Sequence, residues 1–178
     1  MNYRTASDEV IIATDGIVSV RPQDVSLVVR KGTTNARGRA RLCVHPGPDD
    51  PLHEMLIVLD RATYIRPHRH AAKTESFHII EGELDVVVFH DDGSVRDVIS
   101  MGPYGSGYAF YYRIMEPCYH SVVIKTPYVL FHETTNGPFN RADTDFAPWS
   151  PAEGTPGVPA FMEKVQLLAA GTTLRRAA

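Results

Sequence analysis

The chain has 178 residues, of which 43% are hydrophobic and 22% charged, and its formal net charge is −3. This size and composition predict one globular domain over residues 1–178, and the slightly acidic balance argues against nucleic acid as a partner. The sequence contains no run of eighteen apolar residues, and its two cysteines make no disulfide framework, so we expect a cytoplasmic protein without a membrane span.

The first predicted element is a helix over residues 21–32, because Pro22 fits its first turn and Gly32 its C-terminal end. Strand-like segments punctuated by glycine and proline follow it, at residues 39–45, 54–70, 75–101, 108–115, 119–124 and 128–134. Many short strands at close spacing predict an all-β fold, an antiparallel sandwich or barrel with its core at about residues 38–135.

Two of these segments have a more specific pattern. Residues 86–99 predict a hairpin with Asp92 and Gly93 in its turn. Arg37, Arg39 and Arg41 alternate with other residues, which indicates a strand with one charged face.

The character of the chain changes at about residue 137. A stretch rich in proline, glycine and aspartate predicts an extended arm on the surface of the domain, anchored by Trp149. A helix over residues 159–170 then closes the domain, with Phe161, Val165 and Leu168 on one face and Gly171 as its stop.

Three histidines and a glutamate have spacings that suit a metal site. His68 and His70 are two residues apart, so in a strand they point the same way, and a short turn can bring Glu75 back beside them. His120 begins a later strand-like segment. Three imidazoles and one carboxylate form a first shell for Fe, Mn, Ni, Zn or Co. The alternative is a histidine-rich exposed hairpin; in either case His78 points to the opposite face of its strand.

The stretch "PHRHAAKTESFHIIEG" (67–82) resembles the first signature of the cupin superfamily, G-x5-H-x-H-x3/4-E-x6-G, with Ala62 in place of the leading glycine. Of the second signature, G-x5-P-x-G-x2-H-x3-N, only His120 is retained. The resemblance implies a double-stranded β-helix, a small antiparallel barrel that holds one divalent metal in its mouth on His68, His70, Glu75 and His120.

A narrower resemblance covers about residues 20–155. The stretches "RGRARLCVHP", "YIRPHRHAAKTESFHIIEGEL", "FYYRI", "YHSVV" and "FHETTNGPF…DFAPWSPAEG" are similar to the WbuC family of cupin-fold metalloproteins, encoded among bacterial lipopolysaccharide O-antigen genes and elsewhere. The family implies a metal-binding cupin in sugar or nucleotide-sugar metabolism. Tyr119 stands where typical members have tryptophan before the last histidine.

Several further side chains are candidates for contact with a substrate. Those expected to bind a small, anionic or sugar-like ligand are Tyr64, Arg66, Lys73 and Arg113. Tyr64 and Arg66 share strand parity with His68 and His70, and an inward arginine needs an anion, or else a salt bridge with Glu75 or Glu133. The candidates for proton transfer are Tyr112, Tyr119 and His132.

These expectations favour a metal-dependent enzyme, an isomerase, an epimerase or, with Fe(II), an oxygenase. The alternative is a non-catalytic small-molecule-binding cupin whose metal only organises the pocket. A metal position open to a polar pocket favours catalysis, whereas a closed shell favours structure. Pairing through edge strands or terminal segments predicts a homodimer.

Overall fold

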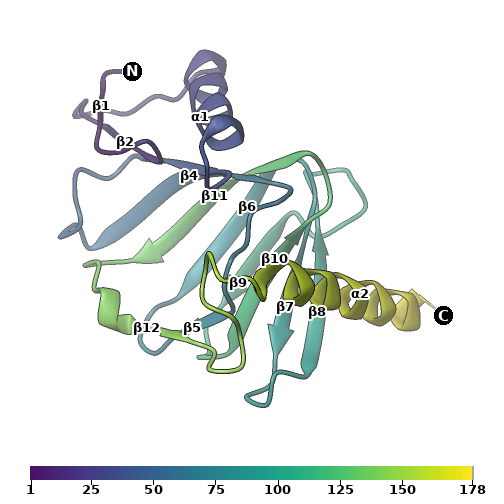
Figure 1. The fold of residues 1–178 in the computed structure, drawn as a ribbon. Coiled ribbons are helices and arrows are strands. Elements are labelled where there is room, and N and C mark those ends of the chain that lie inside the picture. Colours follow the sequence, from purple (N-terminus) through teal and green to yellow (C-terminus); the bar gives the residue numbers. More distant parts are fainter. Residues whose placement is uncertain (178) are drawn as a thin grey trace.

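The computed structural model describes residues 1–177, and it describes side-chain burial through residue 172. Two sheets form most of the molecule (Figure 1). The seven-stranded sheet has the order β1 (Tyr3–Thr5), β2 (Val10–Ala13), β3 (Arg39–Cys43), β4 (Leu52–Asp60), β11 (Tyr128–Asn136), β6 (Glu75–Glu81) and β9 (Tyr111–Ile114). The five-stranded sheet has the order β12 (Thr144–Phe146), β5 (His68–His70), β10 (Tyr119–Ile124), β7 (Leu84–Phe89) and β8 (Val95–Met101). All named pairs are antiparallel except β2 with β3, which are parallel.

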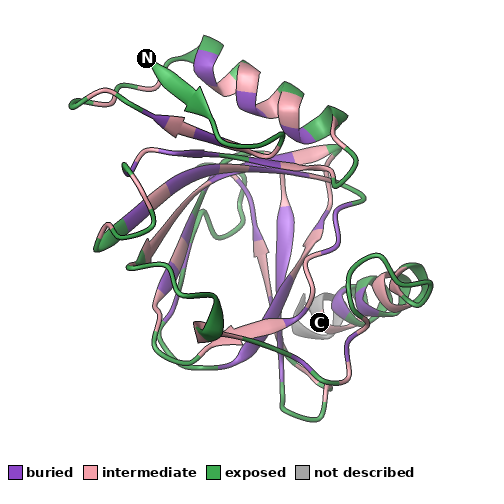
Figure 2. Cartoon of the chain, turned by 60° about the vertical axis from the view of Figure 1, so that its left-hand side comes forward, coloured by how far each residue is buried: buried purple, intermediate pink, exposed green. Residues whose placement is uncertain are grey.

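The main core lies between the two sheets, where the buried residues gather (Figure 2). On β6, Phe77 and Ile79 point into this core while His78 and Ile80 point outward, as the period-2 alternation of a strand requires. Apolar side chains fill one end of the space between the sheets. Glu75, at the start of β6, lies at the other end, so the same strand face carries both the core and a candidate ligand.

Helix α1 (Pro22–Thr34) covers the outer face of the seven-stranded sheet, at the top of Figure 1. The carboxylate of Asp24 accepts a hydrogen bond from the backbone N–H of Arg21 (2.9 Å) and so caps the first turn. Val28 is fully buried against Leu42 and Val58. The predicted helix is thus confirmed, but Gly32 does not end it: the helix continues to Thr34 and has Asn35 as its C-cap.

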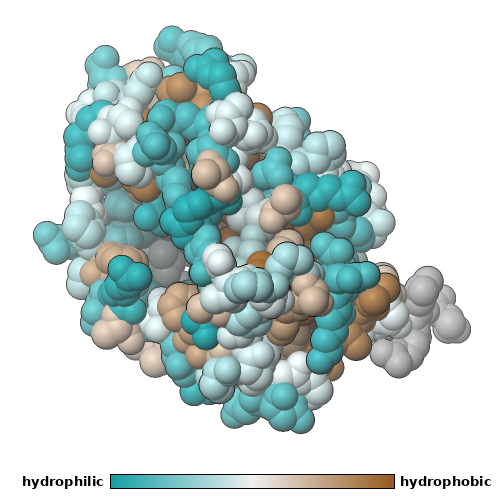
Figure 3. Space-filling model, viewed as in Figure 1, coloured by the Kyte–Doolittle hydropathy of each residue, from teal (hydrophilic) through white to brown (hydrophobic). Residues whose placement is uncertain are grey.

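Helix α2 (Val158–Ala177) packs on the outer face of the five-stranded sheet, where Val165 and Ala169 contact Val87 and Val98. The expected apolar face is wrong at Leu168, which is 38% exposed, because Ala169 takes the buried position. The helix also continues past Gly171. Brown apolar side chains remain visible among teal ones where α2 lies (Figure 3). No helix in the described part of the chain is long and apolar enough to cross a membrane.

The strands extend beyond the expected barrel core of residues 38–135. Strands β1 and β2 precede it, and β12 lies within the arm, where it pairs with β5. The expected strand at 54–70 is two strands, because β4 ends at Asp60 and β5 begins at His68. The β7–β8 hairpin is confirmed, and Trp149 anchors the arm as expected by donating its indole N–H to the Asp91 carbonyl (3.0 Å).

Candidate metal centre

Four side chains converge at the end of the barrel left free by the apolar core. His68 and His70 come from β5, and His120 lies directly opposite His68 on the neighbouring β10. Glu75 reaches them from the facing sheet: its carboxylate oxygens lie 3.4 Å from His70 Nε2 and 3.4 Å from His120 Nε2. One ligand atom from each residue lies within 4.8 Å of all the others. The structure therefore brings together all four residues that the sequence assigns to the metal.

Backbone and hydroxyl groups behind the three imidazoles fix how the rings are oriented. His68 Nδ1 lies 2.8 Å from the Arg66 carbonyl oxygen, and His120 Nδ1 lies 3.1 Å from that of Cys118. A carbonyl oxygen only accepts, so each of these Nδ1 atoms must donate its hydrogen, which leaves the lone pair on Nε2. His70 Nδ1 lies 3.4 Å from Thr144 Oγ1. Such outer partners are typical of metal-binding histidines.

The atoms at the centre of the cluster fit a cation. Among the described residues, His120 Nε2 and Glu75 Oε1 are both buried without a hydrogen bond. Buried polar atoms are costly unless they are satisfied, and a metal ion would satisfy both at once. Three nitrogen donors and one carboxylate match the preference of divalent transition metals.

The protonation states of His68 and Glu75 suit metal binding, whereas at His120 burial lowers the pKa but the Glu75 carboxylate outweighs it and raises the pKa above its usual value. Burial, with His120 nearby, lowers the pKa of His68 to about 4, so this imidazole is neutral near pH 7. Burial opposes ionisation of Glu75, but the neighbouring imidazoles of His120 and His70 outweigh it, so the pKa of this carboxyl lies below its usual range. A neutral imidazole and an ionised carboxylate are the forms that coordinate metals.

Two adjacent pockets that share part of their walls adjoin the cluster, and they are called the larger and the smaller lobe below. The larger lobe has a volume of about 470 Å³, and His68 and His70 lie in its wall. The smaller lobe has a volume of about 240 Å³, and its wall includes His70 and Glu75. Four residues border both lobes: Arg41, His70, Phe139 and Thr144. The cluster is therefore open to a space of the size of a small-molecule site.

Tyr64 and Arg66 are expected from the sequence to contact a ligand, but both donate hydrogen bonds to the C-terminal arm instead. Tyr64 donates its hydroxyl hydrogen to the Pro151 carbonyl (3.0 Å). Arg66 donates to Ser150 Oγ (3.0 Å) and to the Ser150 carbonyl (3.1 Å), and its guanidinium lies over the Phe146 ring (5.0 Å). Neither expected salt-bridge partner of Arg66 is used, because the arm supplies its acceptors. Arg66 still borders the larger lobe.

The structure places Lys73 beside the cavity and Arg113 away from it. Lys73 borders the smaller lobe, 3.9 Å from Asp143 and over the Phe139 ring, so it remains a candidate for ligand contact. Arg113 is exposed on the edge strand β9, next to Ser76 on the outward face. The expectation that Arg113 faces the ligand is wrong, because its neighbours Tyr112 and Ile114 take the inward positions.

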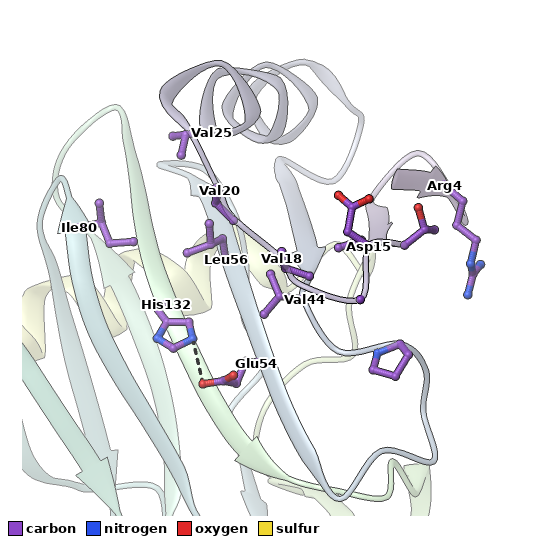
Figure 4. Close-up of a pocket in the computed structure, with 14 residues that line it drawn as sticks. Arg4, Asp15, Val18, Val20, Val25, Val44, Glu54, Leu56, Ile80 and His132 are labelled. Atoms are coloured by element: carbon purple, nitrogen blue, oxygen red, sulfur yellow. Dashed lines mark ion pairs between the residues drawn. The ribbon is translucent and has the colours of Figure 1, made fainter. Parts of the chain in front are cut away.

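None of the three expected proton-transfer residues borders either lobe. Tyr112 is buried in the apolar core, its hydroxyl has no hydrogen-bond partner among the described residues, and burial raises its pKa well above the usual value. Tyr119 points to the outer face, where its hydroxyl donates to Asp145 (3.1 Å). His132 also points outward, toward Glu54 (3.8 Å), in a groove below α1 (Figure 4).

Strand parity explains two of these corrections. Tyr119 is adjacent to His120, and His132 is adjacent to the inward Phe131, so each must face away from the cavity. The same rule places His78 on the outer face, as expected, where it lies opposite His132.

Two residues near the cluster were not among the sequence candidates. Arg41 points inward from β3, since Ala40 and Leu42 take the helix-facing side, and it borders both lobes. Glu133 points inward from β11 into the smaller lobe. Burial, with the Glu75 charge nearby, raises its pKa well above the usual value. Parity with Phe131 places Glu133 inside, consistent with its expected availability to an inward arginine; the sequence carries no signal that the charged face of β3 is the inner one.

Comparisons with known proteins agree with this architecture. Residues 20–101 match the model of a domain of unknown function, DUF6016. No curated protein sequence matches the chain. Among solved structures, protein SO0799 from Shewanella oneidensis is similar with a TM-score of 0.52 and 11% identity, over 63% of this chain and 75% of that one.

Two further solved structures are more distant. The cupin domain of Schizosaccharomyces pombe Cnp3 matches with a TM-score of 0.43 and 13% identity, over 55% of this chain and 64% of that one. A mutant form of the oxalate decarboxylase OxdC from Bacillus subtilis matches with a TM-score of 0.47 and 16% identity, over 61% of this chain and 27% of that one.

The fold is the double-stranded β-helix expected from the sequence: two largely antiparallel sheets enclose a core, and a histidine–glutamate cluster lies at its open end. The chain is thus a cupin-fold protein with a candidate metal site on His68, His70, Glu75 and His120.

Proposed function

We propose that this protein is a metal-dependent enzyme that acts on a small polar substrate of the sugar or nucleotide-sugar type, as an isomerase, an epimerase or an oxygenase. The observation that carries the proposal is the convergence of three Nε2 atoms and a carboxylate at the junction of two solvent-accessible lobes. The resemblance to the WbuC family supports the sugar substrate. A bound divalent metal would act as a Lewis acid toward a carbonyl or hydroxyl group of the substrate.

The side chains around the cluster have separable roles in this proposal. His68, His70, Glu75 and His120 hold the metal, and the carbonyl groups behind the imidazoles keep their Nε2 atoms directed at it. Lys73 and Arg41 border the space for the substrate. Phe139 borders both lobes. The predicted homodimer stays a prediction.

Glu133 replaces the three earlier candidates for proton transfer. It is the carboxyl group, outside the cluster, that points into the smaller lobe from the strand next to Glu75. Its burial favours the protonated form, so a carboxyl oxygen of Glu133 can hold a proton beside the substrate and accept it back.

Glu133→Gln is expected to lower the turnover number by about 100-fold or more, because the amide cannot transfer the proton. The metal content is expected to stay unchanged, because Glu133 is not a ligand. The matched control is Glu54→Gln, which changes a carboxylate on the outer face of the same sheet, paired with His132. Equal rates for Glu133→Gln and the unmodified protein would rule out this role.

Turnover itself can be tested with a panel of sugar phosphates, sugar acids and nucleotide sugars, followed by NMR. We expect conversion of a panel member by the metal-loaded protein and no conversion after the metal is removed by a chelator. Binding without conversion, with the same affinity before and after chelation, would instead support a non-catalytic binding protein with a structural metal.

A further inference from the structure

The wall of the larger lobe is strongly basic. It contains two glutamates, Glu9 and Glu153, against five arginines. The arginines are Arg37, Arg39, Arg41, Arg66 and Arg141. A concave, partly enclosed wall with an excess of positive charge concentrates anions. This charge lies beside the candidate metal centre, since His68 and His70 belong to the same wall.

Three of the five arginines already have acceptors within the protein. Arg37 lies 3.0 Å from Glu9 and 2.7 Å from Glu153, and Arg39 lies 3.3 Å and 3.2 Å from the same two carboxylates. These four residues therefore neutralise one another and attach the arm to the β1–β2 segment. Arg66 donates to Ser150, as described above, and also to the Ala147 carbonyl (3.4 Å).

The two remaining arginines have no such ion-pair partner in the described structure, although the charge of Arg41 lies near enough to Glu133 to oppose the rise in that carboxyl's pKa. Within residues 1–177, neither Arg41 nor Arg141 makes an ion pair or a side-chain hydrogen bond, and both carboxylates of the lobe are already engaged. Arg41 extends from β3 of the seven-stranded sheet, and Arg141 lies in η1 (Arg141–Asp143), which leads into β12 of the five-stranded sheet. These two guanidinium groups, neither of them in an ion pair with another described residue, thus reach one lobe from different sheets.

We propose that Arg41 and Arg141 bind an anionic group of the substrate, a carboxylate or a phosphate, in the larger lobe. A guanidinium presents paired N–H donors that match the oxygen geometry of both groups. Phe139 and Phe146 supply apolar wall around them. The inference rests on the proposed function and names its substrate class: a small hydroxylated molecule that carries an acid or phosphate group.

The two lobes divide the recognition of such a molecule. The anionic end lies between Arg41 and Arg141, and the hydroxylated part extends past His70 toward the smaller lobe. There Lys73, Glu133 and Thr135 offer hydrogen-bonding groups. Combined lobes of about 470 Å³ and 240 Å³ suit a ligand of this size.

The test uses the full chain loaded with metal, titrated calorimetrically with inorganic phosphate and, separately, with malonate at constant ionic strength. We expect at least one probe to bind, and its identity distinguishes a phosphate from a carboxylate substrate. Arg41→Ala and Arg141→Ala are each expected to weaken that binding on the order of tenfold or more. Arg41→Lys keeps the positive charge but loses the paired N–H donors, so we expect it to weaken anion binding less than Arg41→Ala does.

Arg113→Ala is the matched control, because it removes an arginine outside the cavity, and it is expected to leave anion binding unchanged. Failure of both probes to bind, or equal binding by the Arg41→Ala and Arg141→Ala variants and the unmodified protein, would overturn the inference.

Elemental analysis of the same samples separates the two proposals. Arginine-dependent anion binding by a protein that takes up no metal contradicts only the metal-dependent function, and full metal uptake without arginine-dependent binding contradicts only the anion site.

Discussion

His120→Ala is expected to lower metal affinity by more than about 100-fold. Loss of an outer partner of a metal ligand already costs about 10- to 100-fold, and this change removes a ligand itself. His120 is 2% exposed and contacts the Glu75 carboxylate directly, so no other side chain or bulk water easily takes its place. The measurement is metal per chain by elemental analysis after dialysis against buffer that contains a weak chelator.

The matched control for this change is His78→Ala. His78 belongs to the same sequence motif and lies three residues after Glu75, yet it is exposed on the outer face of β6. It is expected to leave the metal content unchanged. Equal retention of metal by the His120→Ala and His78→Ala variants would contradict the assigned ligand set.

Gly82→Ala is expected to destabilise the fold by about 2–5 kcal/mol. Gly82 has a φ of +81°, a conformation that costs an L-residue roughly 1–2 kcal/mol. An added Cβ would also collide with the Tyr128 carbonyl oxygen and lie 2.7 Å from Thr126 Oγ1, and such overpacking costs about 1–3 kcal/mol. The measurement is the free energy of unfolding in urea.

Gly105→Ala isolates the backbone part of this effect. Gly105 has a φ of +88°, but a Cβ there would meet nothing within 4 Å. Only the conformational cost of roughly 1–2 kcal/mol is expected at this position. If the two substitutions destabilise the protein equally, the close approach of the β10–β11 turn to Gly82 does not explain why the motif has glycine there.

The residues that the sequence predicted well are those whose placement depends on short-range geometry. Spacing by two puts His68 and His70 on one face, and a four-residue turn returns Glu75 beside them. Parity alone excludes His78. His120 lies far along the chain, and its assignment required the resemblance to the cupin signatures as well as the residue type.

The incorrect site predictions concern side chains whose chemistry suits the site but whose positions along their strands place them elsewhere. Tyr119 and His132 suit proton transfer by their chemistry, but the parity of their strands turns both side chains outward. Tyr112 does point inward, but it pairs with Phe77 of the apolar core, whereas Ile114 takes the position opposite Glu75. Which end of a barrel holds the cavity depends on the pairing of strands far apart in sequence.

The C-terminal arm explains the remaining differences between the sequence predictions and the structure. Residues 137–157 read as an extended surface segment, yet they contribute β12, the acceptors of Arg66, and the wall residue Arg141. Local propensity cannot show that a segment of three residues adds a strand to a distant sheet edge. The arm determines that Arg66 supports the structure, whereas Arg41 and Arg141 are free to contact a ligand.

The most direct measurement of the central claim is an anomalous-diffraction map of crystals grown with a divalent transition metal. The account predicts one strong peak in each chain, about 2.0–2.2 Å from Nε2 of His68, His70 and His120 and from a carboxylate oxygen of Glu75. A map of the folded protein with no peak inside this cluster, or with the metal held by other residues, would contradict it.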